Sequence, residues 1–147
     1  MAGLLGLDLG QKRTGVAVAE TQVRVASPLE TFEGQPGRSF IARLKQLIDE
    51  YAVSTIVVGL PTSLSGKNNS AEQWVKQKLE WFKSEISGLE WILWDESLTS
   101  FIAEGLLQEQ GVRRDKRKGL RDQLAAQQIL QSYLDFKPRD EAERIKK

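Results

Sequence analysis

The residue with the clearest chemical potential is Asp8, which lies in the middle of an apolar stretch near the N-terminus. A carboxylate in a core strand costs several kcal/mol of desolvation unless a cation or hydrogen-bond donors compensate for it. Gly6 and Gly10, its neighbours on one face of the predicted strand, have no side chains and leave room for a metal ion or a phosphate backbone. The alternative is an aspartate at a hairpin end that accepts hydrogen bonds from loop amides, and Asp8 alone does not separate the two.

Three further acids stand at positions that could bring them to the same site. Asp95 and Glu96 directly follow an apolar strand pattern, and ligands collect at the carboxyl ends of strands in open α/β sheets. Asp122 lies near the start of the last predicted helix, on one stripe with Ala126 and other core-directed residues. Each has a plain alternative: Asp95 and Glu96 as acids that complement a helix dipole, and Asp122 as a surface acid near a helix start.

The absence of histidine and cysteine restricts the chemistry of this chain of 147 residues. It excludes a disulfide, a thiolate nucleophile, a histidine general base and a Cys/His zinc site. Hydrolysis would therefore depend on carboxylates, most directly with metal ions, or on Lys, Ser, Thr or Tyr. The totals of 21 basic and 20 acidic residues give a net charge of +1, so the overall charge predicts no partner.

The distribution of positive charge is more informative than its total. A basic cluster, opposed only by Asp115, spans nine residues, and Lys12 and Arg13 add two cations in the loop of the first predicted hairpin. Such cations could bind the phosphates of a polyanionic substrate, whereas the alternative is a solvated loop. The members of the basic cluster are Arg113, Arg114, Lys116, Arg117, Lys118 and Arg121.

The elements that would position these residues follow from hydrophobic periodicity. Alternation and β-branched runs predict five strands, and apolar residues spaced three and four apart predict four helices. A meander of strands followed by strand–helix alternation indicates an α/β protein with a mixed sheet and helices on both faces. The predicted strands cover 3–9, 15–20, 26–32, 54–60 and 90–95, and the predicted helices cover 40–51, 70–86, 99–110 and 118–134.

We expect one domain over residues 1–137 and a charged C-terminal tail over 138–147. Pro28 places the third strand at an edge of the sheet, because proline cannot donate a hydrogen bond to a strand ladder. No apolar run reaches the roughly 18 residues of a membrane span, and the N-terminus lacks the basic start of a signal peptide. The expected location is therefore the cytoplasm, with no membrane partner.

Four sequence blocks together resemble the YqgF/RuvX family of Holliday-junction-resolvase-like nucleases. They occur in family order and span residues 3–134, nearly the whole chain. One block alone would be a weak signal, but four in order are specific. The blocks are Gly6-Leu7-Asp8-Leu9-Gly10-Gln11-Lys12-Arg13-Thr14-Gly15-Val16-Ala17, Val58-Gly59-Leu60-Pro61 with Gly66, Asp95-Glu96-Ser97-Leu98-Thr99-Ser100, and Asp122-Gln123-Leu124-Ala125-Ala126-Gln127-Gln128-Ile129-Leu130.

The resemblance implies an RNase H-like fold, in which a mixed five-stranded sheet begins with an antiparallel meander and continues with parallel strands. It also implies that Asp8, Glu96 and Asp122 form a catalytic carboxylate cluster that binds metal. We expect two Mg²⁺ or Mn²⁺ ions roughly 4 Å apart, with Asp8 bridging them and the other two acids flanking one each. Two features depart from the family pattern: Ser97 replaces a usual arginine, and the last helix lacks a second acid, for which Asp95 could substitute.

The implied function is that of a nuclease. Members of the family are commonly assigned to maturation of the 5′ end of pre-16S ribosomal RNA, and fold kinship adds cleavage of four-way DNA junctions. We expect Lys12, Arg13, Lys67, Asn68 and the basic cluster to bind the phosphate backbone of the nucleic acid. The sequence does not distinguish RNA from a DNA junction, or a monomer from a homodimer.

Two alternatives come from other functional classes. One is a non-catalytic RNA- or DNA-binding factor in which the acids are vestigial. The other is the phosphate-binding hairpin of the actin/Hsp70/sugar-kinase group, which the Asp8, Gly10 and Gly15 pattern also resembles. Those ATPases need two such domains, and 147 residues hold only one.

Overall fold

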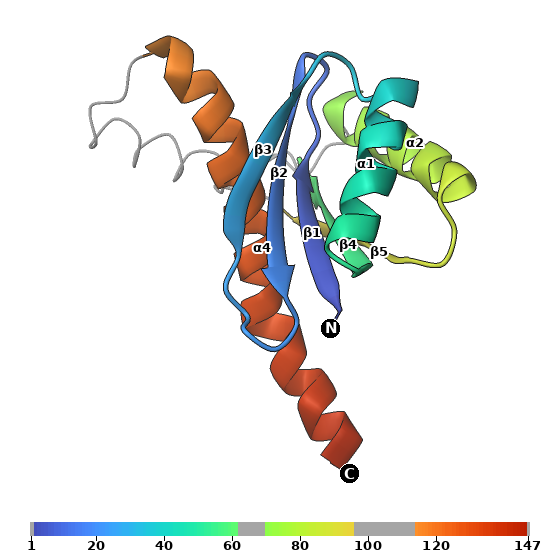
Figure 1. Ribbon diagram of the computed structural model, residues 1–147, viewed down its shortest axis with the longest axis vertical. Coiled ribbons are helices and arrows are strands. Elements are labelled where there is room, and N and C mark those ends of the chain that lie inside the picture. Colours follow the sequence, from blue (N-terminus) through green and yellow to red (C-terminus); the bar gives the residue numbers. More distant parts are fainter. Residues whose placement is uncertain (1, 62–69, 96–113, 147) are drawn as a thin grey trace.

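A single mixed sheet organises the computed structural model, which describes residues 2–61, 70–95 and 114–146, with side chains over 2–61, 70–95 and 120–136. The strand order is β3-β2-β1-β4-β5 (Figure 1). The first three strands pair antiparallel, whereas β4 is parallel to β1 and β5 is parallel to β4, which confirms the predicted mixed sheet. The strands are β1 Gly3–Asp8, β2 Arg13–Glu20, β3 Ser27–Glu33, β4 Val53–Leu60 and β5 Glu90–Asp95.

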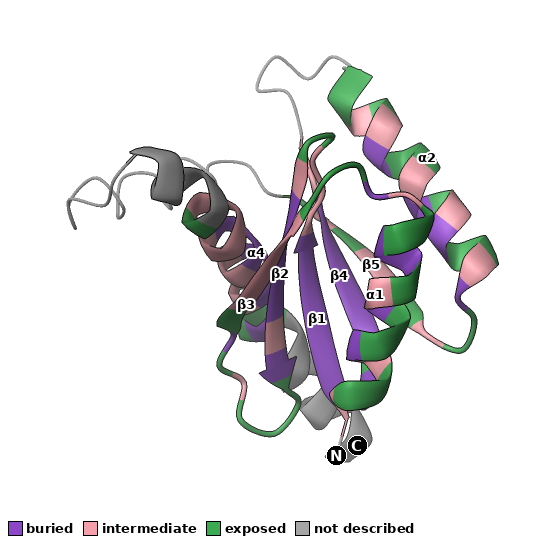
Figure 2. Ribbon diagram, turned by 45° about the horizontal axis from the view of Figure 1, so that its top comes forward, coloured by how far each residue is buried: buried purple, intermediate pink, exposed green. Residues whose placement is uncertain are grey.

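Helices α1 (Arg38–Glu50) and α2 (Ser70–Glu85) cover one face of the sheet (Figure 1). Alternation along β1 sends Leu5 and Leu7 to this face, where both are fully buried against the two helices. The central strands β1 and β4 are buried along most of their length, while the edge strand β3 is partly exposed (Figure 2). The edge position of β3 confirms the prediction from its proline.

Helix α4 (Arg114–Lys146) crosses the opposite face of the sheet (Figure 1). Ala126, Ile129 and Leu130 are fully buried there against small and branched residues of the strands. The packing is close because a Cβ atom added at Gly6 would lie 2.7 Å from Cβ of Leu130 and 2.8 Å from the carbonyl oxygen of Ala126. The predicted helices on both faces of the sheet are therefore confirmed.

A row of glutamines fixes the orientation of α4 against the β2–β3 hairpin. Gln123 donates to Oγ1 of Thr31 at 3.1 Å. Gln127 donates to the carbonyl oxygen of Ala26 at 2.9 Å. Gln131 accepts from the backbone N–H of Ala26 at 2.9 Å and donates to the carbonyl oxygen of Arg24 at 3.1 Å. Because the three glutamines are four residues apart on one helix stripe, they also set which face of α4 meets the sheet.

The last helix is longer than the sequence predicts. It begins at Arg114 and continues through Pro138 to Lys146, whereas the sequence predicts a helix over 118–134. Proline removes one backbone hydrogen bond, but the flanking residues are mostly Glu, Lys, Arg and Ala, which are strong helix formers. Since α4 runs across residue 137, the proposed boundary between domain and tail stays a prediction.

Other differences are small or lie beyond the described part of the chain. Strand β2 begins at Arg13, two residues earlier than expected, so the loop of the first hairpin is shorter than predicted. The predicted helix over 99–110 falls outside the described residues. Among the helices described, none combines the length and the apolar character needed to cross a bilayer.

Candidate functional site

Asp8 is the last residue of β1 and lies at the edge of the sheet where the parallel strands end. It pairs directly with Gly15 of β2. Gly6, two residues earlier, is in contact with α4, so strand alternation directs the half-buried Asp8 side chain to the same face. Asp8 therefore stands on the face covered by α4, which it shares with Gly6 as strand alternation predicts.

Asp122 lies directly above this strand pair. A Cβ atom added at Gly15 would overlap the backbone carbonyl of Asp122 and would lie 3.0 Å from its Cβ atom. Only a glycine in β2 allows the backbones of helix and strand to approach so closely. Since Gly15 is the partner of Asp8 across the two strands, the contact brings Asp8 and Asp122 to one place on the sheet.

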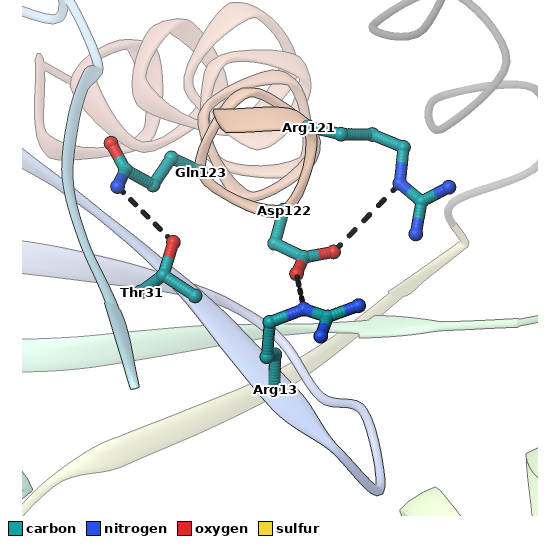
Figure 3. Close-up of polar contacts among 5 residues, drawn as sticks. All are labelled: Arg13, Thr31, Arg121, Asp122 and Gln123. Carbon is teal, nitrogen blue, oxygen red and sulfur yellow. Dashed lines mark hydrogen bonds and ion pairs between the residues drawn. The ribbon is translucent and has the colours of Figure 1, made fainter. Parts of the chain in front are cut away.

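Two arginines lie beside the Asp122 carboxylate (Figure 3). The Nε atom of Arg13, from the start of β2, lies 3.2 Å from Oδ2 of Asp122. The Nε atom of Arg121 lies 4.0 Å from Oδ1. The Asp122 side chain is only 14% exposed, whereas those of Arg13 and Arg121 are 24% and 38% exposed. The carboxylate is thus the most buried group of a small charged cluster.

Burial has the largest effect on the pKa of the Asp122 carboxyl group. Desolvation raises the pKa of Asp122 above its ordinary value, and the charge of Glu33 acts in the same direction. The guanidinium groups of Arg121 and Arg13 lower the pKa, but they do not offset the effect of burial. An ionised Asp122 is therefore destabilising in the metal-free protein, and a further positive charge at this position would be favourable.

We expect Asp122→Asn to melt a few degrees higher than the wild type at neutral pH in metal-free buffer. A carboxyl whose pKa is higher in the folded state binds its proton more tightly there. Stability therefore falls as pH rises from the unfolded-state pKa, near 3.8, through the raised folded-state pKa, and asparagine avoids this loss. Each ~1 kcal/mol of stability corresponds to roughly 2–4 °C in melting temperature for a chain of this length.

Melting curves in EDTA over a pH series from acid to neutral measure this difference. The gain should vanish at acid pH, where the wild-type carboxyl is protonated, and grow towards neutral pH. Asp49→Asn, at an exposed position on α1, controls for the removal of one negative charge. A neutral-pH melting temperature of Asp122→Asn below that of the wild type would contradict the prediction, because the ion pair with Arg13 would then outweigh the cost of burial.

Asp95 lies apart from the other two aspartates. The neighbouring Trp94 faces α4, since its indole N–H donates to Oγ of Ser132 at 3.0 Å, and alternation turns Asp95 to the opposite face. Strand β4 separates β1 from β5, so the Cα atoms of Asp8 and Asp95 are about 10 Å apart by strand spacing. The structure therefore places Asp95 on the other face of the sheet from Asp8 and Asp122, and its role as a substitute ligand stays a prediction.

The chemistry of the donors fits a hard divalent cation, although the described residues supply only part of a ligand set. Asp8 and Asp122 offer carboxylate oxygens, which Mg²⁺ and Mn²⁺ prefer. Within residues 2–61, 70–95 and 120–136, no group of three or more acidic, histidine or cysteine side chains is arranged to hold a metal ion. Glu96, the third predicted ligand, lies outside the described residues.

The predicted phosphate-binding residues are only partly described. Lys12 is exposed in the β1–β2 hairpin, and Arg13 and Arg121 lie beside Asp122. Four members of the basic cluster, Arg114, Lys116, Arg117 and Lys118, belong to the first two turns of α4 by their backbone, and their side chains are outside the description. Lys67, Asn68 and Arg113 lie outside the described residues altogether.

The glycines around Asp8 have a different role from the one expected. The sequence interpretation assigned the space beside Gly6 and Gly10 to a ligand, and this is wrong. Helix α4 fills the space at Gly6, and the backbone carbonyl of Arg13 fills it at Gly10. The interpretation also missed Gly15 as the residue that admits Asp122. A glycine inside an apolar strand is a signal of close backbone approach and could have identified it.

Comparison with known protein sequences supplies an independent finding. The family model described as "RuvX: Holliday junction resolvase" matches residues 2–136. A protein of Geobacillus sp. (strain WCH70) is 43% identical over 136 residues, which cover 91% of this chain and 98% of the relative. A protein of Chloroflexus aurantiacus is 38% identical over 133 residues, which cover 90% and 86%. Both relatives are named "Putative pre-16S rRNA nuclease".

Among solved structures, T. thermophilus RuvC in complex with a Holliday junction substrate has a similar fold. The TM-score is 0.56, and the match covers 92% of this chain and 97% of that chain. Sequence identity is 14%, so the similarity concerns the fold alone. With the observed strand order, it confirms the expected RNase H-like fold.

Proposed function

We propose, from the premise that this chain belongs to the RuvX family, that it is a metal-dependent nuclease that processes the 5′ end of pre-16S ribosomal RNA in the cytoplasm. The observation that carries the proposal is the packing of Asp122 against Gly15, the strand partner of Asp8, in a chain that matches its relatives over most of their length. Those relatives carry the rRNA nuclease name, which supports RNA as the substrate.

Asp8 and Asp122 are proposed to hold the cation together with Glu96. Mg²⁺ or Mn²⁺, when bound, would supply activation of a water molecule and stabilisation of the leaving oxygen. The chain positions its two described ligands through rigid elements: the end of a buried strand for Asp8, and a helix fixed by close glycine contacts for Asp122. Placement on such elements, and not on loops, keeps the distance between ligands constant.

The start of α4 is proposed to bind the phosphate backbone. Cations in the first turns of a helix interact unfavourably with its dipole, which favours negative charge at that end. The basic residues from Arg114 to Lys118 therefore do not serve the stability of α4, and binding of a polyanion is a better explanation for them. Lys12 in the neighbouring hairpin adds an exposed cation close to Arg13.

Cleavage of a four-way DNA junction is the second candidate function. It is favoured by the description of the matching family model, which names a Holliday junction resolvase. The fold similarity to RuvC does not add to it, because 14% identity carries no information on substrate. Both candidates use the same acids and differ only in which nucleic acid reaches them.

One assay compares the candidates directly. The full chain, with Mg²⁺ or Mn²⁺, is incubated with an RNA spanning the 5′ end of pre-16S rRNA, with a four-way DNA junction, and with a linear duplex as control. We expect cleavage of the RNA that EDTA abolishes, and slower cleavage of the junction by at least about tenfold, or about 1.4 kcal/mol in activation free energy. Preferred cleavage of the junction would establish the second candidate. Binding of either substrate without metal-dependent cleavage would instead indicate a non-catalytic factor.

A further inference from the structure

The ion pair between Arg13 and Asp122 occupies a carboxylate that the proposed function requires for a metal ion. The Nε atom of Arg13 lies 3.2 Å from Oδ2 of Asp122 (Figure 3). Arg13 precedes Gly15 by two residues in β2, so alternation places it on the face that carries Asp8 and meets α4. The guanidinium group and both described candidate ligands therefore belong to one partly buried region.

We propose that Arg13 is an internal competitor for the divalent cation: it holds Asp122 in the metal-free protein, is displaced when the cation binds, and then binds a phosphate of the nucleic acid. This inference rests on the proposed function, because it takes Asp122 as a ligand. A cation on the Asp122 carboxylate and a guanidinium group 3.2 Å from it would be two positive charges at one partly buried anion, and they would repel each other at this short range. The planar donor fork of arginine suits a phosphate as well as a carboxylate, so the released side chain has a second partner.

The partial burial of the pair makes this competition large enough to measure. Water screens an exposed ion pair almost completely, but the Arg13 and Asp122 side chains are only 24% and 14% exposed. The cation has to break this contact when it binds to the wild type, and that cost should lower the wild-type affinity by about tenfold, the fold-change that corresponds to 1.4 kcal/mol. A protein without the competing guanidinium should bind the cation more tightly by the same factor.

Only the side chain of Arg13 has to move in this exchange. Its backbone is held in β2, where it pairs with Glu33 of β3. Two residues later, Gly15 is packed against the backbone of Asp122. Strand and helix can therefore keep their positions while the guanidinium group exchanges a carboxylate for a phosphate.

Arg121 provides the matched control for charge. Its Nε atom is 4.0 Å from Oδ1 of the same carboxylate, and its side chain is more exposed than that of Arg13. The variants Arg13→Gln and Arg121→Gln each remove one positive charge next to Asp122. Only Arg13→Gln also removes the close contact, so a difference between the two variants measures displacement and not net charge.

Calorimetric titration of Mn²⁺ into the EDTA-treated full chain tests the first half of the proposal. We expect Arg13→Gln to bind Mn²⁺ about tenfold more tightly than the wild type, and Arg121→Gln to change the affinity by less than about threefold. Arg13→Lys keeps the charge but loses the planar fork, and its affinity should lie between those of the wild type and Arg13→Gln. It also serves as the second variant if the glutamine substitution impairs folding.

Binding of the RNA substrate at several salt concentrations tests the second half. Loss of one phosphate contact should reduce the slope of log affinity against log salt by about one in Arg13→Gln. The same variant is thus expected to bind the metal more tightly and the nucleic acid more weakly. A merely structural role of Arg13 would not change the two affinities in opposite directions.

The outcomes separate this inference from the function on which it rests. If Asp8→Asn binds Mn²⁺ as well as the wild type, the proposed metal site is wrong and the competitor role of Arg13 is wrong with it. If binding depends on Asp8 but Arg13→Gln leaves the affinity unchanged or weaker, only the competitor role is overturned. An unchanged salt slope for Arg13→Gln overturns its proposed contact with a phosphate.

Discussion

Asp8→Asn is expected to lower metal-dependent cleavage by roughly 10³-fold or more while leaving the fold intact. A metal ion at a phosphodiester contributes several kcal/mol of transition-state stabilisation, and every 1.36 kcal/mol is a factor of ten in rate. Asparagine has the size and shape of aspartate but carries no charge, so it binds a hard cation poorly. The side chain is only half-buried at the end of β1, where this exchange leaves the packing unchanged.

Cleavage of the preferred substrate under multiple-turnover conditions measures this loss, with Mn²⁺ supplied in excess. Asp49→Asn is the matched control, because Asp49 is an exposed aspartate on α1, on the other side of the sheet. The control should retain wild-type activity, and both variants should melt close to the wild type. Full activity of Asp8→Asn at normal stability would show that the hydrolytic site lies elsewhere in the chain.

The faces of the sheet could be predicted from the sequence because strand alternation is a local property. Gly6 and Asp8 were expected to share one face of the first strand, and the structure confirms this, with Leu5 and Leu7 on the other face. The same holds for the stripe that Asp122 shares with Ala126 on the last helix. Each pattern depends only on backbone geometry within one element.

The relation between elements could not be predicted in the same way. Whether Asp122 approaches Asp8 depends on the rotation and depth of α4 against the sheet. The rotation is set by glutamine hydrogen bonds to the β2–β3 hairpin, for example from Gln127 to Ala26, across about a hundred positions of sequence. The depth is set by glycines whose neighbours are unknown until the strands are paired. The ion pair of Asp122 with Arg13 follows from both and has no separate signature in the sequence.

Gly15→Ala is expected to destabilise the protein by about 3 kcal/mol, the upper part of the usual range for overpacked cores. The added Cβ atom would overlap the backbone carbonyl of Asp122, and a backbone, unlike a flexible side chain, cannot rotate away. Helix α4 would have to lift from β2, against the hydrogen bonds that Gln123 and Gln131 make with the neighbouring hairpin. For a chain of this length the loss corresponds to a decrease of roughly 6–12 °C in melting temperature.

Gly37→Ala separates this steric effect from the general cost of replacing a glycine. Gly37 stands at the start of α1 with a φ of −100°, and a Cβ atom added there would meet nothing within 4 Å. Alanine is a poorer N-cap than glycine, so the control should lose at most about 1 kcal/mol. Thermal melting of both variants, together with cleavage assays below their melting temperatures, makes the comparison.

If Gly15→Ala were as stable as Gly37→Ala, α4 could not lie at this distance from β2. If Gly15→Ala were destabilised but fully active at low temperature, Asp122 would not need to stand over the Asp8–Gly15 pair.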